Sequence, residues 1–473
     1  MNSGKKIVLL IIAAAIIVLI SRLSFISAGY GADVDAWRVV AVARDMTETG
    51  DFVYSRVPGH PLHELICTLI WDKGPLWMNG FTAVMSVIAA VFFMLILNRL
   101  GFKNIFLPAL AFAFTPVIFI NSVNALEHIW ALAFIMGSMY FAIDNKPLAA
   151  GILLGLADGC RLPSILLLVP FALILYFNSG KKLKTFMQFA AAVFGVTLIL
   201  FLPLFLKFDL FNVYKGSYPD VIYIAFRMFI ATWGFIGLAA ILTVCAVEFI
   251  YRIKSRNDNA SHISKKDRYF DASLWAGIIL FAISFLLLPH KAAYLIPTVP
   301  LVLILLGKFL NPRLFNAVCI SLVISPFLLG VNRTDLDVLP DFSQYSARFT
   351  TKGGEIVFDL LNGPVLSEHS KRLNQLEFTA KIISETGRLE RKSVVVVGES
   401  FPLIDVTLPH NHQGDVIIQG NTIYEYFLDS SKVKRYSTGE FDIYYLPNID
   451  EYNLELHSLD LKDHGAKNLL EKR

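Results

Sequence analysis

Long apolar runs recur along the first 331 residues of this 473-residue chain, and they constrain its fold more than any other feature. A helix needs about 20 mostly apolar residues to cross a bilayer. Eleven runs are candidates, so the sequence predicts a polytopic α-helical membrane protein. They lie near residues 7–26, 76–97, 105–121, 127–143, 147–159, 162–177, 186–206, 228–250, 272–288, 292–307 and 314–331.

The composition agrees with a bilayer as the solvent for much of the chain. Hydrophobic residues make up 55% of the sequence and charged residues only 17%, whereas about a quarter of a typical soluble protein is charged. The formal net charge of +4 is too small for a chain of this length to indicate a nucleic-acid partner. The four cysteines form no CxxC pair, so we expect neither a zinc site nor a disulfide framework.

Basic residues are distributed unevenly between the loops, and this predicts the orientation. With the N-terminus in the cytoplasm, the cytoplasmic loops hold sixteen Lys and Arg residues and the outer segments eight, as the positive-inside rule requires. We therefore expect a plasma (inner) membrane protein with a cytoplasmic N-terminus and its C-terminal region outside. The start could instead be a cleaved signal peptide, because Lys5-Lys6, an apolar stretch and Ser27-Ala28-Gly29 also fit that pattern.

The first outer loop, residues 28–73, is long enough to hold structure of its own. Val34, Trp37 and Val40 fall at helical spacing, and the loop is expected to form one or two helices lying on the membrane surface. This loop belongs to the predicted membrane domain, residues 1–331.

The composition turns polar after the membrane domain. Residues 332–473 predict a soluble α/β domain on the extracytoplasmic side, with a helix over 367–384. Strands are expected at 393–397, 416–418 and 441–445. A second domain of this kind could select an acceptor or cover a site in the membrane domain.

Most ionisable groups beyond the cytoplasmic loops gather on the outer side. Charged groups at membrane depth are costly and usually serve a function, so an outward-facing polar site is the simplest explanation. Its acidic candidates are Asp33 and Asp35, which follow the first span, and Glu127, which precedes the fourth. Such carboxylates can accept a proton from an attacking hydroxyl or hold a divalent cation. The alternative is that they only cap helix starts.

Basic side chains complement these acids. A phosphate at the headgroup level is the anion that would most naturally collect them. Snorkelling is the alternative, although Arg161 has apolar turns on both sides and little room for it. His60, His128 and Tyr294 are candidates for substrate contacts, and the histidines lack the HxxxH or HExxH spacing of a metal site. The basic candidates are Arg56, Arg161, Lys215, Arg227, His290 and Lys291.

The first outer loop carries Asp35, then Thr49-Gly50-Asp51-Phe52, then Arg56 and a Pro-Gly turn. This order resembles the first loop of the class C glycosyltransferases (GT-C), especially the branch that contains the protein O-mannosyltransferases and the lipid A aminoarabinose transferase. Residues 155–163 are similar to that family's Gly-Leu-Ala…Thr-Arg/Lys-x-Pro helix break, and residues 290–295 resemble the His-Lys-Glu-x-Arg-Phe segment of its lipid-linked mannosyltransferases. The resemblance covers roughly the predicted membrane domain.

The chain departs from the family's pattern at three positions. Ala36 replaces the glutamate beside the family's aspartate, while Ala292 and Tyr294 replace the glutamate and arginine of the His-Lys segment. Asp33 is near enough to compensate for the first change, so the choice between Asp33 and Asp35 stays open. The contact to sugar or phosphate at Tyr294 must also differ from the family's.

The resemblance implies a GT-C fold and an inverting glycosyltransferase that uses a polyprenyl-phosphate-linked sugar on the outer face of the membrane. Asp35 or Asp33 would deprotonate a hydroxyl of a lipid, glycan or protein acceptor, with Glu127 as a further catalytic candidate. The basic candidates would stabilise the charge on the departing phosphate. No cofactor is expected, although a divalent metal at Asp33 and Asp35 stays an alternative, because oligosaccharyltransferase relatives use one.

Three other functions fit parts of the pattern. A secondary transporter would also gather charge in a membrane bundle, but near the midplane and between related halves. A polymerase or ligase of whole lipid-linked glycans is nearer in chemistry and would need a diphosphate carrier. A non-catalytic receptor built on the C-terminal domain is the third.

Overall fold

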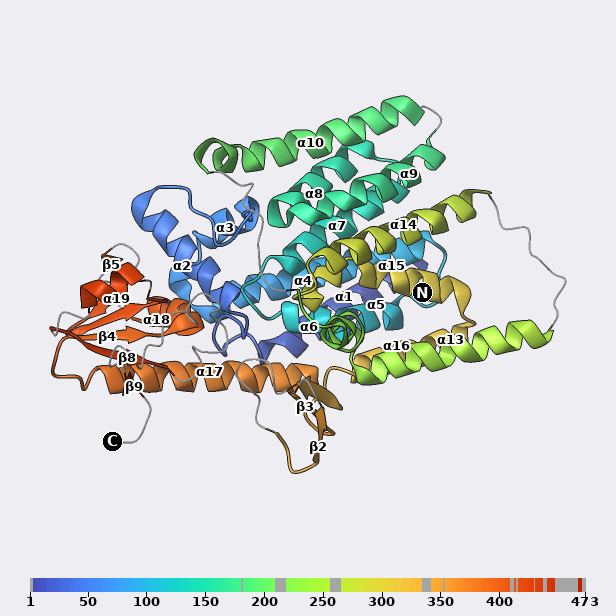
Figure 1. Ribbon diagram of the computed structural model, residues 1–473. Helices are drawn as coiled ribbons and strands as arrows, with labels where there is room; N and C mark the ends of the chain where they lie inside the picture. The colour runs from blue at the N-terminus through green and yellow to red at the C-terminus, as the bar shows by residue number, and fades with distance from the viewer. Residues whose placement is uncertain are drawn as a thin grey trace.

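The computed structural model describes residues 3–179, 182–208, 218–255, 265–333, 342–351, 354–408, 412–413, 416–428, 430–436, 440–446 and 467–469. They form a bundle of apolar helices with a mixed region of helices and strands at one end (Figure 1). Helix α1 begins at the opposite end of the bundle. We call the end that carries the mixed region the domain end.

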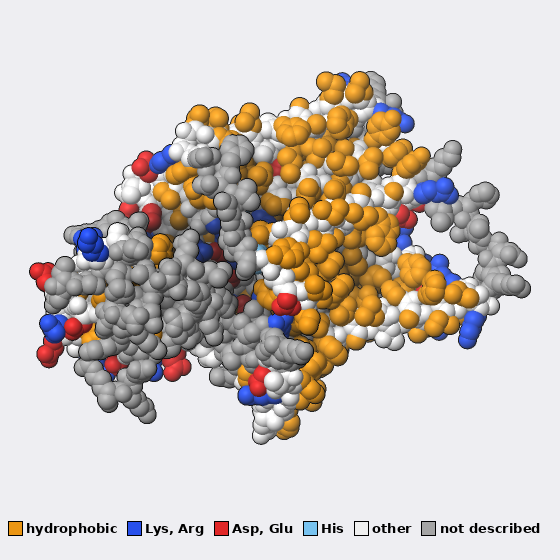
Figure 2. Space-filling view, in the orientation of Figure 1, with side chains coloured by type: hydrophobic (Ala, Val, Ile, Leu, Met, Phe, Trp, Pro, Cys, Tyr) orange, Lys and Arg blue, Asp and Glu red, His pale blue; other side chains and the backbone are white. Residues whose placement is uncertain are grey.

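Five of the described helices are long and apolar enough to cross a membrane, judged by length and composition. They are α1 (Ser3–Leu23), α4 (Pro75–Arg99), α10 (Lys182–Lys207), α13 (Phe235–Ser255) and α14 (Lys265–Leu287). Shorter apolar segments accompany them, namely α7 (His128–Ile143), α8 (Pro147–Cys160), η2 (Leu162–Leu167) with α9 (Leu168–Asn178), α15 (Thr298–Phe309) and α16 (Pro312–Ile324). The bundle confirms the predicted polytopic membrane protein, and Figure 2 shows its apolar side chains as a broad belt.

The sequence predicts one span over residues 105–121, but the structure divides this run into two helices. It forms α5 (Phe106–Phe114) and α6 (Pro116–Asn121). Thr115 is extended between them, with a ψ of 128°. Proline disfavours a helical conformation in the residue before it and has no N–H for an intrahelical bond, so Pro116 ends the first helix and starts the second.

The predicted span over 228–250 begins later than expected. Gly234, with a φ of 69°, separates α13 from the helical residues before it. Those residues form three short pieces: α11 (Val221–Ala225), the π-helical turn η3 (Phe226–Ile230) and α12 (Ala231–Trp233).

The first outer loop forms a buried helix followed by shorter pieces. Helix α2 (Val34–Thr49) forms where the sequence predicts a helix on the membrane surface, but most of its residues are buried within the protein. It ends where Gly50 adopts a left-handed φ of 71°. Its Trp37 and Val40 pack in a small apolar cluster between the bundle and the C-terminal region. Helix α3 (Pro61–Cys67) and the turn η1 (Trp71–Lys73) lead into α4.

The C-terminal region contains two sheets and confirms the predicted α/β architecture. Three antiparallel strands have the order β1-β3-β2, with bounds Gly330–Arg333, Gly354–Asp359 and Ser346–Thr351. The larger sheet has the order β5-β6-β7-β4-β8-β9, in which β4 pairs in parallel with β7 and β8. Its bounds are β4 (Ser393–Val396), β5 (His412–Gln413), β6 (Val416–Gln419), β7 (Thr422–Glu425), β8 (Asp442–Tyr445) and β9 (Lys467–Asn468).

Helices α17 (Pro364–Thr386), η5 (Gly398–Ser400), α18 (Phe401–Thr407) and α19 (Ser430–Tyr436) complete the C-terminal region. Buried arginines join this region to the first outer loop. Arg372 of α17 donates hydrogen bonds to the backbone carbonyls of Ala28, Gly29 and Val123, at 2.7, 2.8 and 3.0 Å. Arg44 of α2 donates to the Asp405 carboxylate of α18 at 3.1 and 3.2 Å. The C-terminal region therefore holds α2 directly.

Candidate active site

The first two acidic candidates lie at the start of α2, and they differ in role. Asp33 caps the helix, because its side chain accepts a hydrogen bond from the Asp35 N–H at 3.0 Å. The capping interpretation therefore describes Asp33. The Asp35 carboxylate contacts cations from other segments, and only 12% of its side chain is exposed.

Lys291 brings the two carboxylates together. It lies between α14 and η4 (Ala292–Leu295), and its Nζ is 2.5 Å from Asp33 Oδ2. The same Nζ donates a hydrogen bond to Asp35 Oδ2. Arg38, one turn along α2, donates to the other oxygen of Asp35 at 3.0 Å. Two cations therefore donate hydrogen bonds to Asp35, one to each oxygen.

Glu127 is the buried centre of the remaining contacts, with no exposed side-chain surface. Arg56 Nη2 donates to both of its oxygens, at 2.7 and 2.6 Å, and Arg161 Nη1 donates to one at 3.0 Å. Arg56 Nη1 is 3.5 Å from Asp35 Oδ2, so Arg56 links the two carboxylates. We call the connected set the charge network: Asp33, Asp35, Arg38, Arg56, Glu127, Arg161 and Lys291.

The three candidates for substrate contacts border this network. His128 Nδ1 is 2.9 Å from Arg161 Nη1, and the Tyr294 ring centre is 4.6 Å from the Arg161 guanidinium. His60 Nδ1 is 2.8 Å from the Cys160 carbonyl, which can only accept, so this nitrogen carries the proton. His60 Nε2 is 3.8 Å from Glu127 Oε1. The structure thus brings together candidates from four separate parts of the chain.

Burial and neighbouring charges shift the pKa values of Asp35 and His60. Burial alone would raise the pKa of Asp35, but the charges of Lys291 and Arg56 outweigh it and hold this pKa well below its usual range. Burial lowers the pKa of His60 to about 3, and the nearby Arg56 charge acts in the same direction. Asp35 is therefore an anion near pH 7, and His60 is neutral.

Two buried atoms of the site have no hydrogen-bond partner among the described residues. They are Arg56 Nη1, whose contact with Asp35 is an ion pair at 3.5 Å, and His60 Nε2. Buried polar atoms in folded proteins are usually hydrogen-bonded. These atoms can therefore receive a polar ligand without first losing a hydrogen bond.

Two of the basic candidates lie in a neighbouring group, and one lies outside the described residues. The His290 backbone carbonyl accepts a hydrogen bond from the Tyr223 hydroxyl at 3.0 Å. The Arg227 guanidinium lies 4.9 Å from the Tyr223 ring centre. Arg227 therefore lies within the broken segment before α13, and His290 lies against the same segment. His290 precedes Lys291 in the sequence, so this group adjoins the charge network. Lys215 is not among the described residues.

Sequence reasoning missed three polar residues at this site. Arg38 Nη2 donates to Glu399 Oε2 at 3.1 Å and to the Tyr426 hydroxyl at 3.4 Å. Arg38 could have been found, because it lies three residues after Asp35 and so on the same helix face. Glu399 had a weaker signal: it follows the buried strand β4, at the carboxyl end of parallel strands where sites often form.

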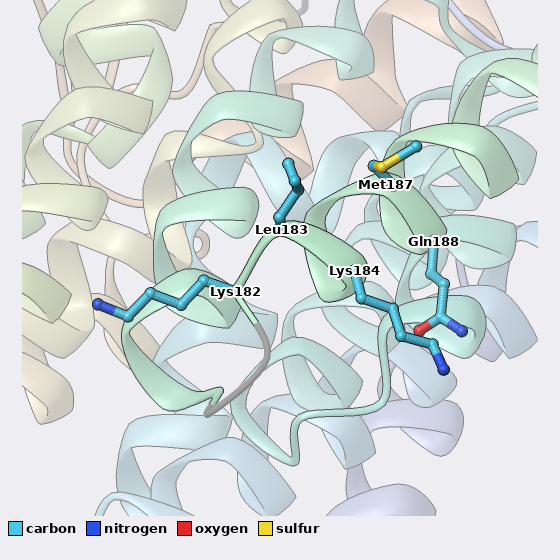
Figure 3. A pocket seen from close by; sticks show the side chains of 5 residues that line it. All are labelled: Lys182, Leu183, Lys184, Met187 and Gln188. Carbon is cyan, nitrogen blue, oxygen red and sulfur yellow. The ribbon is translucent and has the colours of Figure 1, made fainter.

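No metal site is evident in the described residues, and a surface hollow lies apart from the charge network. Within the described residues, no three His, Cys, Asp or Glu side chains are grouped as they would be around a metal ion. A surface hollow of about 630 Å³ lies at the start of α10, and Figure 3 shows Lys184 and Gln188 side by side on its wall with Lys182 turned away. The other end of α10 approaches the first outer loop, where Lys207 is 3.5 Å from Asp51. The hollow is therefore separate from the charge network.

The sequence matches no protein-family model and no curated protein sequence. Among solved structures, the chain is similar to ArnT from Cupriavidus metallidurans bound to undecaprenyl phosphate, with a TM-score of 0.49 and 15% sequence identity. The similarity covers 68% of this chain and 63% of the ArnT chain, which is less than two thirds of its length.

Proposed function

We propose that this chain is a membrane glycosyltransferase. It moves a sugar from a polyprenyl-phosphate donor to an acceptor hydroxyl, with inversion, at the domain end of the bundle. The observation that carries the proposal is the continuous chain of contacts from Lys291 through Asp35, Arg56 and Glu127 to Arg161. A carboxylate beside three cations at the edge of an apolar bundle suits a reaction that breaks a sugar–phosphate bond next to a lipid.

Asp35 is the general base of the proposed reaction. It takes the proton of the acceptor hydroxyl as the hydroxyl oxygen attacks the anomeric carbon from the face opposite the phosphate. The bond between that carbon and the phosphate oxygen breaks, and its electron pair leaves with the lipid phosphate. Lys291 and Arg56 stabilise the charge on the leaving group, because they already lie within reach of Asp35.

Binding of the donor makes Asp35 a stronger base. Without a donor, Lys291 and Arg56 lower the pKa of Asp35 and make it a weak base. A phosphate that binds these cations neutralises part of their charge and raises the Asp35 pKa towards the range in which it accepts a proton effectively. Donor binding and base activation are therefore linked by the same two cations.

Glu127 has a positioning role in this proposal instead of the catalytic one expected from the sequence. Its oxygens accept hydrogen bonds from Arg56 and Arg161, and its side chain has no exposed surface. A carboxylate held in this way sets the distance between two arginines that carry like charges. Both guanidinium groups then face the same phosphate.

A transfer assay in proteoliposomes tests the proposal, with a polyprenyl-monophosphate sugar and a polyprenyl-diphosphate oligosaccharide as alternative donors. Asp35→Asn should abolish transfer from the monophosphate donor, whereas Asp33→Asn, which removes the charge but keeps an oxygen that can cap the helix, should retain most of it. Asp45→Asn is the matched control, because Asp45 lies on the same helix with its side chain 44% exposed. Full activity of Asp35→Asn would refute the proposed base, and use of only the diphosphate donor would favour a glycan polymerase or ligase.

A further inference from the structure

We propose that the β2–β3 hairpin is an amphipathic element that lies on the membrane surface and binds the lipid headgroup region beside α13. Neighbouring residues of a strand point to opposite faces of its sheet, and paired residues share a face. Phe349 pairs with Ile356, and Ala347 pairs with Phe358, so one face of the hairpin is apolar.

The opposite face of the same hairpin is more polar, although it also holds Val357, which pairs with Arg348 and is fully buried. There Ser346 pairs with Asp359, and Thr350 pairs with Glu355. Arg348 lies on this face as well, one residue before Phe349 in the strand. Apolar and polar residues therefore alternate along β2, as in a strand with one face towards lipid and the other towards water.

The apolar face is exposed at its outer strand. Phe349 of β2 and Tyr345, the residue before β2, each have 56% of their surface exposed, which is high for aromatic side chains. The Phe349 ring meets the Phe358 ring edge to face at 5.6 Å. Phe349 and Phe358 therefore form one apolar patch.

This patch joins the surface of a membrane-crossing helix. Phe358 also contacts Phe235, the first residue of α13, with ring centres 5.8 Å apart. Figure 1 shows the hairpin beside the start of α13 and projecting from the bundle at its domain end. Figure 2 shows apolar side chains continuing from the belt onto this region. By length and composition α13 can cross a membrane, so we expect its first residue at the edge of the hydrocarbon. The patch then lies at the level where aromatic side chains favour the interface.

The strand order favours the headgroup region over the hydrocarbon. Among the described residues, strand β2 is an edge of the sheet β1-β3-β2, so half of its backbone groups have no partner strand there. Unpaired N–H and C=O groups are not tolerated in hydrocarbon, but water reaches them at the headgroup level. A second copy of the chain is the other occupant that an exposed sheet edge can attract.

Photolabelling of the whole protein tests the location of the hairpin. The protein is placed in phosphatidylcholine nanodiscs, at one copy per disc, with a lipid that carries a diazirine in its acyl chain. Mass spectrometry should find adducts at Tyr345 and Phe349 at least fivefold above those at Arg348 and Thr350. Leu242 of α13, which is 61% exposed, reports labelling of a membrane helix in the same sample.

Two matched variants separate this inference from a folding defect. Phe349→Asp should lower labelling of Tyr345 several-fold, whereas Thr350→Asp on the opposite face should not, with Leu242 labelled in both. Equal labelling of the two faces, or no adducts on the hairpin while Leu242 is labelled, would overturn the proposal. Adducts that disappear when each disc holds two copies would overturn it in favour of contact between copies.

Discussion

Two pairs of arginines in this molecule use their hydrogen bonds in different ways. In the interface pair, Arg372 donates from all three nitrogens to backbone carbonyls, and Arg44 donates to both oxygens of Asp405. In the network pair, Arg56 has a buried nitrogen with no hydrogen bond to any residue that the structure describes, and Arg161 shares Glu127 with it. The hydrogen-bond donors of the interface pair are occupied by residues of the protein, whereas the network pair can still donate a hydrogen bond to a ligand. We therefore expect substitutions in the interface pair to lower stability and substitutions in the network pair to lower activity.

The largest effect is expected for Arg56→Met. Loss of one preorganised donor to a developing anion costs about 10²–10³ in rate, so transfer should fall by that factor. Arg56→Lys keeps the charge without the planar fork and should recover part of the rate. Initial rates in proteoliposomes measure both. A rate for Arg56→Met within threefold of wild type would contradict a role of the network pair in the reaction.

The next effect is a loss of stability in Arg44→Met. The variant removes the Arg44 guanidinium from its ion pair with Asp405, whose side chain is 9% exposed. Removing one partner of a buried ion pair costs about 3–5 kcal/mol, so the free energy of unfolding should fall by that amount while activity per folded molecule stays the same. Denaturant unfolding in detergent measures the change. The double variant Arg44→Met with Asp405→Leu should recover part of the loss, and no recovery would contradict this account of the interface.

Acid should weaken the fold through His60. Its pKa is about 3 in the folded protein and near 6.5 when unfolded, so between these values the unfolded state binds a proton that the folded state does not. Stability is therefore lost as the pH falls below 6.5, by about 2 kcal/mol between pH 6.5 and pH 5. Unfolding at several pH values should show a flatter slope for His60→Asn, and an unchanged slope would mean that His60 is not the group responsible.

The smallest effect is expected for Glu399→Gln. Its carboxylate holds Arg38, which in turn holds Asp35, but its side chain is 48% exposed. Exposed ion pairs are worth about 0–1 kcal/mol, so kcat should fall about fivefold or less with the donor KM unchanged. Glu385→Gln is the control, because its partner Arg388 is an exposed arginine of the same C-terminal region. An equal change in both variants would remove the link between the C-terminal region and Asp35.

The convergence of Asp35, Arg161 and Lys291 could be predicted, because each lies at an end of an apolar run on the same predicted side of the membrane. Loops at one end of a bundle are close in space even when they are distant in sequence. The division at Thr115 also had a signal in Pro116, but the apolar composition on both sides outweighed it. The contact between Glu399 and Arg38 could not be predicted, because nothing local indicates how the C-terminal region lies against α2.

The most direct test of the charge network is a structure of the protein in a nanodisc with a polyprenyl monophosphate. We expect the phosphate oxygens about 3 Å from Lys291 Nζ and the Arg56 guanidinium, with Asp35 released from Lys291. A phosphate held at Arg227 and His290, or in the hollow beside Lys182, with Lys291 still bound to Asp35, would contradict the account.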